Sequence, residues 1–291
     1  MKEKVSGMSR GNVIAADAMP YPLDNHAPQA VGYHALLGQL WDGWSVARLK
    51  DLFGEPRETM AGLRCWEVGA GVGGQFAVWL AGRVGRDGFV LATDRQVRDI
   101  PALANLAVVE HDLTGDREYP GWPGGFDLIH VRLVLQYLPQ RRRILSRLAD
   151  RLAPGGWLLV EDWVTTPAVE MVVSSVSEQD AALYVRVQQA LSNVFAEAGT
   201  DHSWGGQVYP ALLAEDLTTV GTQMCGQVWP AGGPGCRLVA GTIAQARDRL
   251  RAAGITVKEL DRVGELLTRD DPGFALAGHL MHSTSGCRPP G

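Results

Sequence analysis

The spacing of hydrophobic residues changes near residue 60 and divides the chain into two parts. Between His34 and Leu52 the apolar positions fall at mixed three- and four-residue steps, which predicts an amphipathic helix or two short helices. From residue 63 onward, short apolar runs alternate with helical patterns. Strands that alternate with helices at this spacing predict an α/β fold around a doubly wound, mostly parallel sheet.

The predicted elements follow from these runs and from the turn residues between them. Strands are expected over residues 63–68, 89–93, 106–109, 126–131 and 157–160. Helices are expected over 75–84 and from Pro139 to Leu152. After Trp163 the alternation is interrupted, with helical patterns over 177–198, 244–253 and 257–268 and strand patterns over 218–229 and 274–282.

This order predicts how the chain is divided. We expect an N-terminal helical cover over residues 1–59 and a core over 60–291, with lid insertions near 164–205 and 231–272. A doubly wound sheet binds its ligands at the carboxyl ends of the strands. The cover and the insertions are therefore expected to enclose that edge.

Composition narrows the class of protein. The 291 residues include 27 basic and 32 acidic ones, a net charge of −5, which argues against a nucleic-acid partner. The four cysteines form no C-x-x-C pair, so we expect no metal site. Neither a signal peptide nor a membrane span is evident in the apolar pattern. We therefore expect a cytoplasmic protein with a small-molecule partner and leave a homodimer open.

The strongest local signal is a glycine-rich turn after the first predicted strand. Gly69, Gly71 and Gly74 satisfy G-x-G-x-x-G, a spacing that lets backbone N–H groups approach a ligand. By itself this pattern also fits a dinucleotide site or a tight turn without a ligand. Asp94 ends the next predicted strand, where a carboxylate can accept both hydroxyls of a ribose.

Two acidic positions favour one ligand over another. Glu67 lies two residues before the first glycine, where its negative charge complements a cation better than an anionic pyrophosphate. S-adenosylmethionine carries a sulfonium and an ammonium group, so Glu67 favours it over NAD. Asp112 follows the third predicted strand and could accept a hydrogen bond from an adenine amino group.

These motifs, taken in order, resemble a known family. Residues 67–74 (EVGAGVGG), 92–94 (ATD), 110–112 (EHD), 126–130 (FDLIH), 138–139 (LP) and 154–160 (PGGWLLV) carry the resemblance. Over residues 60–163 the chain resembles a class I S-adenosylmethionine-dependent methyltransferase. The resemblance implies a Rossmann-like, mostly parallel seven-stranded sheet and S-adenosylmethionine as the cofactor.

The resemblance also implies roles for individual residues. It places the methionine part of the cofactor against Glu67, Gly69, Gly71 and Gly73. It places the ribose at Asp94, with Arg95 beside the adenine, and brackets the adenine with Asp112 and Leu113. It implies that His130, Val131 and Arg132, at the end of the fourth strand, face the sulfonium region.

The acceptor is less constrained. Residues 21–25 (YPLDN), 270–274 (DDPGF) and 286–289 (GCRP) resemble a bacterial natural-product branch of the family, which includes enzymes that methylate indole carbon. This implies a small aromatic acceptor, with C3 of the indole in a tryptophan-derived cyclic dipeptide as the preferred choice. O- or N-methylation of a phenolic or polyketide metabolite fits the residues almost as well.

Several side chains are candidate bases for the acceptor. They are Asp24, His26, His130, Tyr137 and His202. We assign catalytic roles to Tyr21, Asp24 and His130, and expect the segment around Tyr21 to close over the site. Tyr137 stands where the branch often carries His, whereas His279 and His282 are interpreted as structural residues.

Two other classes of function stay open at this point. A nicotinamide-dependent reductase would also use a glycine turn and a ribose-binding carboxylate. A non-catalytic cofactor-binding protein on the same fold would retain the motifs and transfer nothing.

Overall fold

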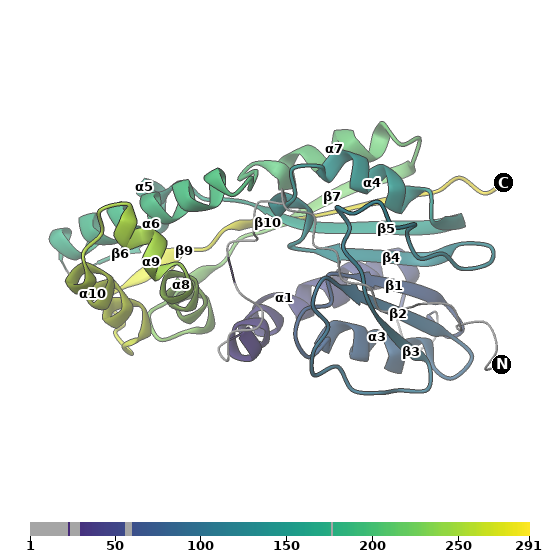
Figure 1. The fold of residues 1–291 in the computed structure, drawn as a ribbon, viewed down its shortest axis with the longest axis horizontal. Helices are drawn as coiled ribbons and strands as arrows, with labels where there is room; N and C mark the ends of the chain where they lie inside the picture. The colour runs from purple at the N-terminus through teal and green to yellow at the C-terminus, as the bar shows by residue number, and fades with distance from the viewer. Residues whose placement is uncertain (1–22, 24–29, 56–59, 176) are drawn as a thin grey trace.

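The computed structural model describes residues 23, 30–55, 60–175 and 177–291. Its centre is a seven-stranded sheet in the order β3-β2-β1-β4-β5-β10-β7 (Figure 1). β10 runs antiparallel to β5 and β7, and the other neighbouring pairs are parallel. The strands are β1 (Arg64–Val68), β2 (Phe89–Asp94), β3 (Leu106–Glu110), β4 (Phe126–Arg132), β5 (Leu152–Val164), β7 (Thr218–Cys225) and β10 (Leu280–Cys287). The predicted Rossmann-like α/β sheet is confirmed.

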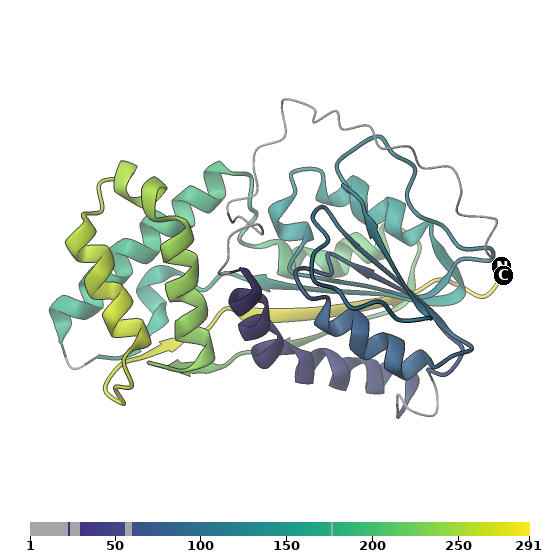
Figure 2. The same ribbon diagram turned by 60° about the horizontal axis from the view of Figure 1, so that its bottom comes forward.

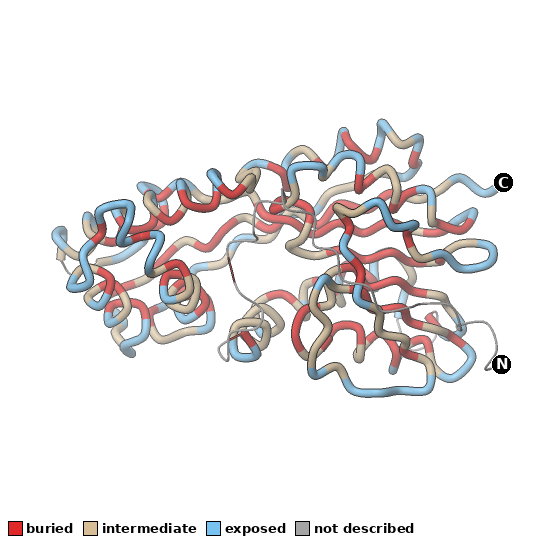
Figure 3. Tube along the Cα trace, viewed as in Figure 1, coloured by how far each residue is buried: buried red, intermediate tan, exposed pale blue. Residues whose placement is uncertain are grey.

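Helices cover both faces of this sheet because its strands are apolar on both sides. In β4, Leu128 belongs to a cluster with residues of α1 (Ala30–Phe53) and α3 (Gln75–Val84). The neighbouring Ile129 and Val131 belong to a second cluster with α4 (Arg141–Ala149) and α7 (Trp204–Leu213). In the burial map the central strands β1, β2 and β4 are mostly buried, whereas the edge strands β3 and β7 are mostly intermediate or exposed (Figure 3).

A second lobe lies beside the sheet (Figures 1 and 2). It contains a three-stranded antiparallel sheet in the order β6-β9-β8. Its elements are α5 (Ala168–Met171), β6 (Val172–Ser174), α6 (Glu178–Glu197), β8 (Val228–Pro230), α8 (Pro234–Gln245), α9 (Arg247–Ala252), α10 (Val257–Thr268) and β9 (Ala275–Ala277). β6 follows β5, β8 follows β7 and β9 precedes β10, so this order continues the order β5-β10-β7 of the large sheet.

One hydrophobic cluster joins the two parts of the molecule. It contains Trp41 of α1, Trp163 of β5 and Trp229 of β8, together with apolar residues of α6, α8 and α10. Leu23 belongs to the same cluster and is buried. Because this apolar surface lies between sheet and lobe, burying it stabilises the position of the lobe.

The region 34–52 forms one helix, α1, which is one of the two predicted alternatives. Three other predicted elements differ from the observed ones. The predicted helix 244–253 corresponds to the end of α8 and to α9, and most of α8 is not predicted. The predicted strand 218–229 is split into β7 and β8, which belong to different sheets. The predicted strand 274–282 is likewise split into β9 and β10. The apolar pattern continues across each break, so it cannot show where the chain passes from one sheet to the other.

Helix α7 was missed because its sequence is rich in poor helix formers. It contains Gly205, Gly206 and Pro210, all of which disfavour helix interiors. A side chain at Gly205 would place its Cβ 2.5 Å from the carbonyl oxygen of Asp162, so glycine lets the helix pack directly on β5. Tertiary packing therefore overrides helix propensity here. Within the described ranges, no helix is long and apolar enough to cross a membrane.

Candidate active site

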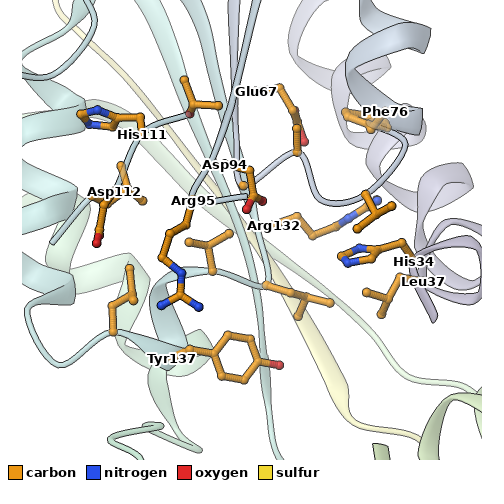
Figure 4. Close-up of a pocket in the computed structure, with 18 of the residues that line it drawn as sticks. His34, Leu37, Glu67, Phe76, Asp94, Arg95, His111, Asp112, Arg132 and Tyr137 are labelled. Carbon is orange, nitrogen blue, oxygen red and sulfur yellow. The ribbon is translucent and has the colours of Figure 1, made fainter. Parts of the chain in front are cut away.

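A cavity of about 450 Å³ lies at the carboxyl ends of β1, β2, β3 and β4, the edge that the fold predicts (Figure 4). His34, Leu37 and Phe76 lie on one side of it and His111 and Asp112 on the other. Seven predicted cofactor residues line the cavity: Glu67, Gly69, Asp94, Arg95, Asp112, Leu113 and Arg132.

The glycine turn is held in a conformation that other residues rarely adopt. Gly69, Gly71 and Gly73 have φ values of 74°, 67° and 81°. The N–H groups of Gly69 and Ala70 donate to the carbonyl of Thr93 at 2.7 and 3.0 Å, which ties the turn to β2. A Cβ on Gly69 would lie 2.2 Å from Val134 Cγ2. The turn therefore depends on glycine for both backbone and space.

Asp94 organises this turn from the end of β2. Its Oδ2 accepts a hydrogen bond from the Gly71 N–H at 2.9 Å, and its Oδ1 accepts one from the Gln96 N–H at 3.0 Å. A carboxylate oxygen has two lone pairs, so Asp94 retains acceptor capacity toward the cavity. Gly71 and Gly73 do not themselves line the cavity, so their part in the turn is conformational.

The prediction that His130 faces the reacting atoms is not supported by its position. Its side chain is fully buried and lies outside the cavity lining. Nδ1 lies 2.6 Å from Glu67 Oε2, and Nε2 lies 3.1 Å from Glu161 Oε2. Burial lowers the pKa of His130, but the two carboxylates more than offset this and raise it to about 9. His130 is therefore a buried imidazolium that positions Glu67.

The same cluster extends to α1 and β10. Glu161 accepts hydrogen bonds from Ser45 and from Ser283, the latter at 2.7 Å. Burial opposes ionisation of Glu161, but His130 and Arg132 outweigh it and lower the carboxyl pKa. Glu67 and Glu161 flank one imidazolium, so the three groups carry a net negative charge when all are ionised. This charge complements a cationic ligand in the adjoining cavity.

Arg132 lies at the cavity wall and is paired. Its guanidinium donates to Asp42 at 2.6 Å and to Ser45 at 2.7 Å, and it lies over the ring of Phe76. Val131, its neighbour in β4, is fully buried on the opposite face of the sheet, so the prediction that it faces the ligand is wrong.

The side of the cavity beyond β3 is formed by residues 111–114. Asp112 Oδ1 accepts hydrogen bonds from the Thr114 N–H and hydroxyl at 2.8 and 2.7 Å, which fixes this turn. His111 is buried, and burial lowers its pKa. In the part of the chain that is described, its Nε2 has no hydrogen-bond partner. The ring of His111 lines the cavity, but its Nε2 is fully enclosed.

A second, smaller cavity of about 60 Å³ lies between the sheet and the second lobe. Tyr33 of α1 and Tyr137 of the 3₁₀ turn η1 (Leu135–Tyr137) line both cavities. The walls include the aromatic side chains of Trp163, Phe195 and Trp229. Burial raises the pKa of Tyr33 to about 12, although a hydrogen bond with Thr242 of α8 opposes the shift.

One tyrosine and two histidines named from the sequence lie at these cavities. Tyr137 lines both cavities, and His202 lines the second one. His279, interpreted as structural, lines the second cavity as well. Tyr21, Asp24 and His26 lie outside the described residues.

Helix α1 supplies the contacts that sequence reasoning missed. Tyr33, His34 and Asp42 line the first cavity, although this helix was predicted only as a cover. Burial lowers the pKa of His34, while nearby Asp94 opposes that shift. The polar residues His34, Asp42 and Ser45 interrupt the apolar pattern of α1, and this interruption is the sequence feature that could have indicated a functional role for the helix.

The fold and the cavity together define a Rossmann-like methyltransferase. A family model described as a methyltransferase domain matches residues 45–201. The chain therefore belongs to this family, and the predicted methyltransferase class is confirmed at the level of the family.

Two curated relatives and one solved structure illustrate the likeness. Methyltransferase str2 of Strobilurus tenacellus is 37% identical over 162 residues, which are 55% of this chain and 53% of that protein. Methyltransferase str3 of the same organism is 35% identical over 115 residues, 38% of this chain and 36% of that protein. The match thus spans about half or less of each relative's length.

The solved structure is phosphoethanolamine N-methyltransferase 2 of Haemonchus contortus, in complex with phosphomonomethylethanolamine and S-adenosylhomocysteine. It is 16% identical, with a TM-score of 0.50, and the alignment covers 86% of this chain and 53% of that one. At this identity the likeness concerns the fold.

The residues at the cavity fit S-adenosylmethionine. A net negative cluster at Glu67 suits a cationic ligand, and Asp94 keeps acceptor capacity toward the cavity at the end of β2.

Proposed function

We propose that this chain transfers a methyl group from S-adenosylmethionine to a small, largely apolar aromatic acceptor. The observation that supports this most is the adjacency of two unlike cavities, since Tyr33 and Tyr137 line both. One carries carboxylates suited to a cationic cofactor, and the other has aromatic walls suited to a flat acceptor. Within the proposal, C3 of the indole in a tryptophan-derived cyclic dipeptide is the preferred acceptor.

The chemistry requires positioning above all. The acceptor atom must lie behind the methyl group, in line with the sulfur–carbon bond that breaks, while the new bond to the acceptor forms. When bound, S-adenosylmethionine would supply the methyl group from its sulfonium, which would leave as a neutral thioether. For an indole carbon the positive charge passes to the ring, which then loses its N–H proton. The residues proposed to hold the cofactor are Glu67, Gly69, Asp94, Arg95, Asp112, Leu113 and Arg132.

Incubation with isotopically labelled S-adenosylmethionine and a panel of aromatic metabolites, read by mass spectrometry, tests this proposal. We expect label in a neutral aromatic compound, and fragmentation will distinguish a methylated carbon from oxygen or nitrogen. Calorimetric titration with S-adenosylhomocysteine and with NADH provides the control. Binding of NADH alone would overturn the proposal in favour of a reductase, and cofactor binding without transfer to any compound would favour a binding protein.

We further propose that Tyr21 and Asp24, both outside the described residues, act on the acceptor side. A phenol and a carboxylate near an otherwise apolar site can orient the acceptor or accept its proton. Deleting residues 1–29 is expected to abolish turnover while binding of S-adenosylhomocysteine persists. If the truncated protein turns over normally, the catalytic groups lie elsewhere. Asp24→Asn and Tyr21→Phe then separate the two side chains by their effects on kcat.

A further inference from the structure

We infer that the second cavity binds a substituent at the non-reacting end of the aromatic acceptor, and that this substituent carries an uncharged carbonyl group. The inference rests on the proposed methyl transfer and specifies the chemistry of its acceptor. It follows from the hydrogen-bonding directions of the buried polar side chains in this cavity.

His279 presents a hydrogen-bond donor. The backbone N–H of Thr166 donates to His279 Nδ1 at 3.2 Å, so Nδ1 must be the unprotonated nitrogen of a neutral ring. The proton of the ring therefore lies on Nε2. Within the described ranges Nε2 has no partner, and it is not one of the fully enclosed polar atoms. The residue is only 9% exposed and lines the cavity, so Nε2–H can donate to a ligand there.

Gln188 of α6 supplies a second donor from the other wall. Its side chain is only 4% exposed, and its Oε1 accepts a hydrogen bond from the Tyr184 hydroxyl at 3.5 Å. The amide nitrogen has no partner among the described residues and is likewise not fully enclosed. A buried donor without a partner is costly, so a carbonyl oxygen in this cavity would satisfy groups that are otherwise unpaired.

The Thr165 hydroxyl offers an acceptor to the cavity, in contrast to the donors of His279 and Gln188. His202 Nε2 lies 2.9 Å from the carbonyl of Ser192, which can only accept, so in the neutral ring Nε2 carries the proton and Nδ1 accepts. The Thr165 hydroxyl, 3.1 Å from that Nδ1, donates to it. Its oxygen is therefore left as an acceptor in the cavity. The donors of His279 and Gln188 and the acceptor of Thr165 together suit an amide, which has a carbonyl oxygen and an N–H.

The cavity excludes charge. Its lining contains no Asp, Glu, Lys or Arg among the described residues. Burial lowers the pKa of His279 to about 4, so this ring stays neutral at physiological pH. A carboxylate or ammonium placed here would lose its hydration without gaining a counter-charge. The acceptor is therefore uncharged at this end.

The aromatic walls and the size of the cavity determine how the acceptor lies. Trp229 is held between Gly235 and Gly278, where a Cβ would lie 2.1 and 2.4 Å from its ring. This fixes one wall, and Trp163 packs against His279 with ring centroids 4.9 Å apart. A space of about 60 Å³ accommodates a substituent and not a whole acceptor. The reacting end must therefore extend past Tyr33 and Tyr137 toward the larger cavity.

Three probes that share an indole ring test the inference. Each is added to protein that is saturated with S-adenosylhomocysteine. They are indole-3-carboxamide, 3-methylindole and indole-3-carboxylate, and their binding is measured by ligand-observed NMR at pH 7.5. We expect the carboxamide to bind about five- to tenfold more tightly than either of the others, the gain typical of a hydrogen bond to a buried donor. Equal binding of all three, or preference for the carboxylate, would overturn the inference.

Variants at His279 localise the effect. His279→Phe removes the donor and is expected to abolish the preference for carboxamide over 3-methylindole, whereas His279→Gln, which restores an N–H near the same place, recovers it. Binding of S-adenosylhomocysteine by both variants shows that the fold is retained. If the parent protein fails to bind S-adenosylhomocysteine, the proposed function is at fault. If it binds and the preference persists in His279→Phe, only the carbonyl assignment is wrong.

Discussion

The two cavities are lined by chemically different residues. The larger one is lined by charged side chains and a glycine turn at the ends of adjacent strands, whereas the smaller one is lined by aromatic rings and neutral polar groups from the sheet, α1 and the second lobe. Charged side chains suit a ligand that itself carries charged groups, as S-adenosylmethionine does. Neutral donors and rings discriminate by shape and hydrogen-bond direction. The following predictions test whether this division of labour holds.

The largest effect is expected at the glycine turn. Gly69→Ala places a Cβ 2.2 Å from Val134 Cγ2 at a positive φ. Overpacking and left-handed strain together cost about 2–5 kcal/mol. Binding of S-adenosylhomocysteine, measured by calorimetry, should therefore fall by at least about thirtyfold.

Gly73→Ala is the matched control, because Gly73 also has a positive φ but nothing lies within 4 Å of its Cβ. We expect only the left-handed strain of about 1–2 kcal/mol. If the two variants lose affinity equally, the contact with Val134 is not what shapes the turn.

The buried imidazolium is expected to make stability depend on pH. His130 has a pKa of about 9 in the fold against an ordinary value of 6.5, so its contribution is fully present below pH 6.5 and is lost as the pH rises through 9. The change is on the order of 3 kcal/mol. Urea unfolding from pH 6 to 10, compared with that of His130→Gln, measures it. A pH dependence shared by both proteins would assign the effect to another group.

The second cavity is expected to lack this pH dependence. His279 is already neutral above a pKa of about 4, so titration of this ring should not change the affinity for indole-3-carboxamide between pH 6 and 8.

An intermediate effect is expected at Asp94, the carboxylate that we propose binds the ribose. Asp94→Ala removes a charged acceptor and two hydrogen bonds that hold the turn, so affinity for S-adenosylhomocysteine should fall at least about tenfold. Thermal unfolding shows whether the core stays folded. An unchanged affinity would mean that the ribose is bound elsewhere.

The smallest effect is expected where the cavities meet. Tyr33→Phe removes the hydrogen bond to Thr242, a change worth about 1 kcal/mol, and keeps the ring. We expect the KM for the acceptor to rise about fivefold while the affinity for S-adenosylhomocysteine stays within twofold. If Tyr33→Phe weakened the binding of S-adenosylhomocysteine more than that of the acceptor, Tyr33 would belong to the cofactor site and not to the acceptor site.

The first cavity could be largely predicted from sequence because its residues follow strands in order. Glu67, Asp94 and Asp112 each stand after a recognisable apolar run. The position of His130 could not be read this way, because the burial of one face of β4 depends on Glu161 from a strand that lies next to it only in the fold.

The second cavity could not be predicted because no local pattern defines it. Gln188, Thr165 and His279 lie far apart in the sequence and meet only when the lobe packs on the sheet. The proton positions that give them meaning depend on backbone groups such as the Thr166 N–H and the Ser192 carbonyl. The sequence identifies a histidine, but whether each ring nitrogen donates or accepts a hydrogen bond depends on the partner that it meets in the fold.

The continuation of β5-β10-β7 into β6-β9-β8 has a mechanical consequence. Three neighbouring strands pass from core to lobe, and the two sheets are separated by residues 165–171, 226–227 and 278–279. The connecting segments are hydrogen-bonded to one another: the Gly278 N–H donates to the Gln227 carbonyl at 2.8 Å, and the Thr166 hydroxyl donates to the Gly278 carbonyl at 2.9 Å. A displacement of the lobe would therefore also move Thr165 and His279, which lie in these segments and line the second cavity.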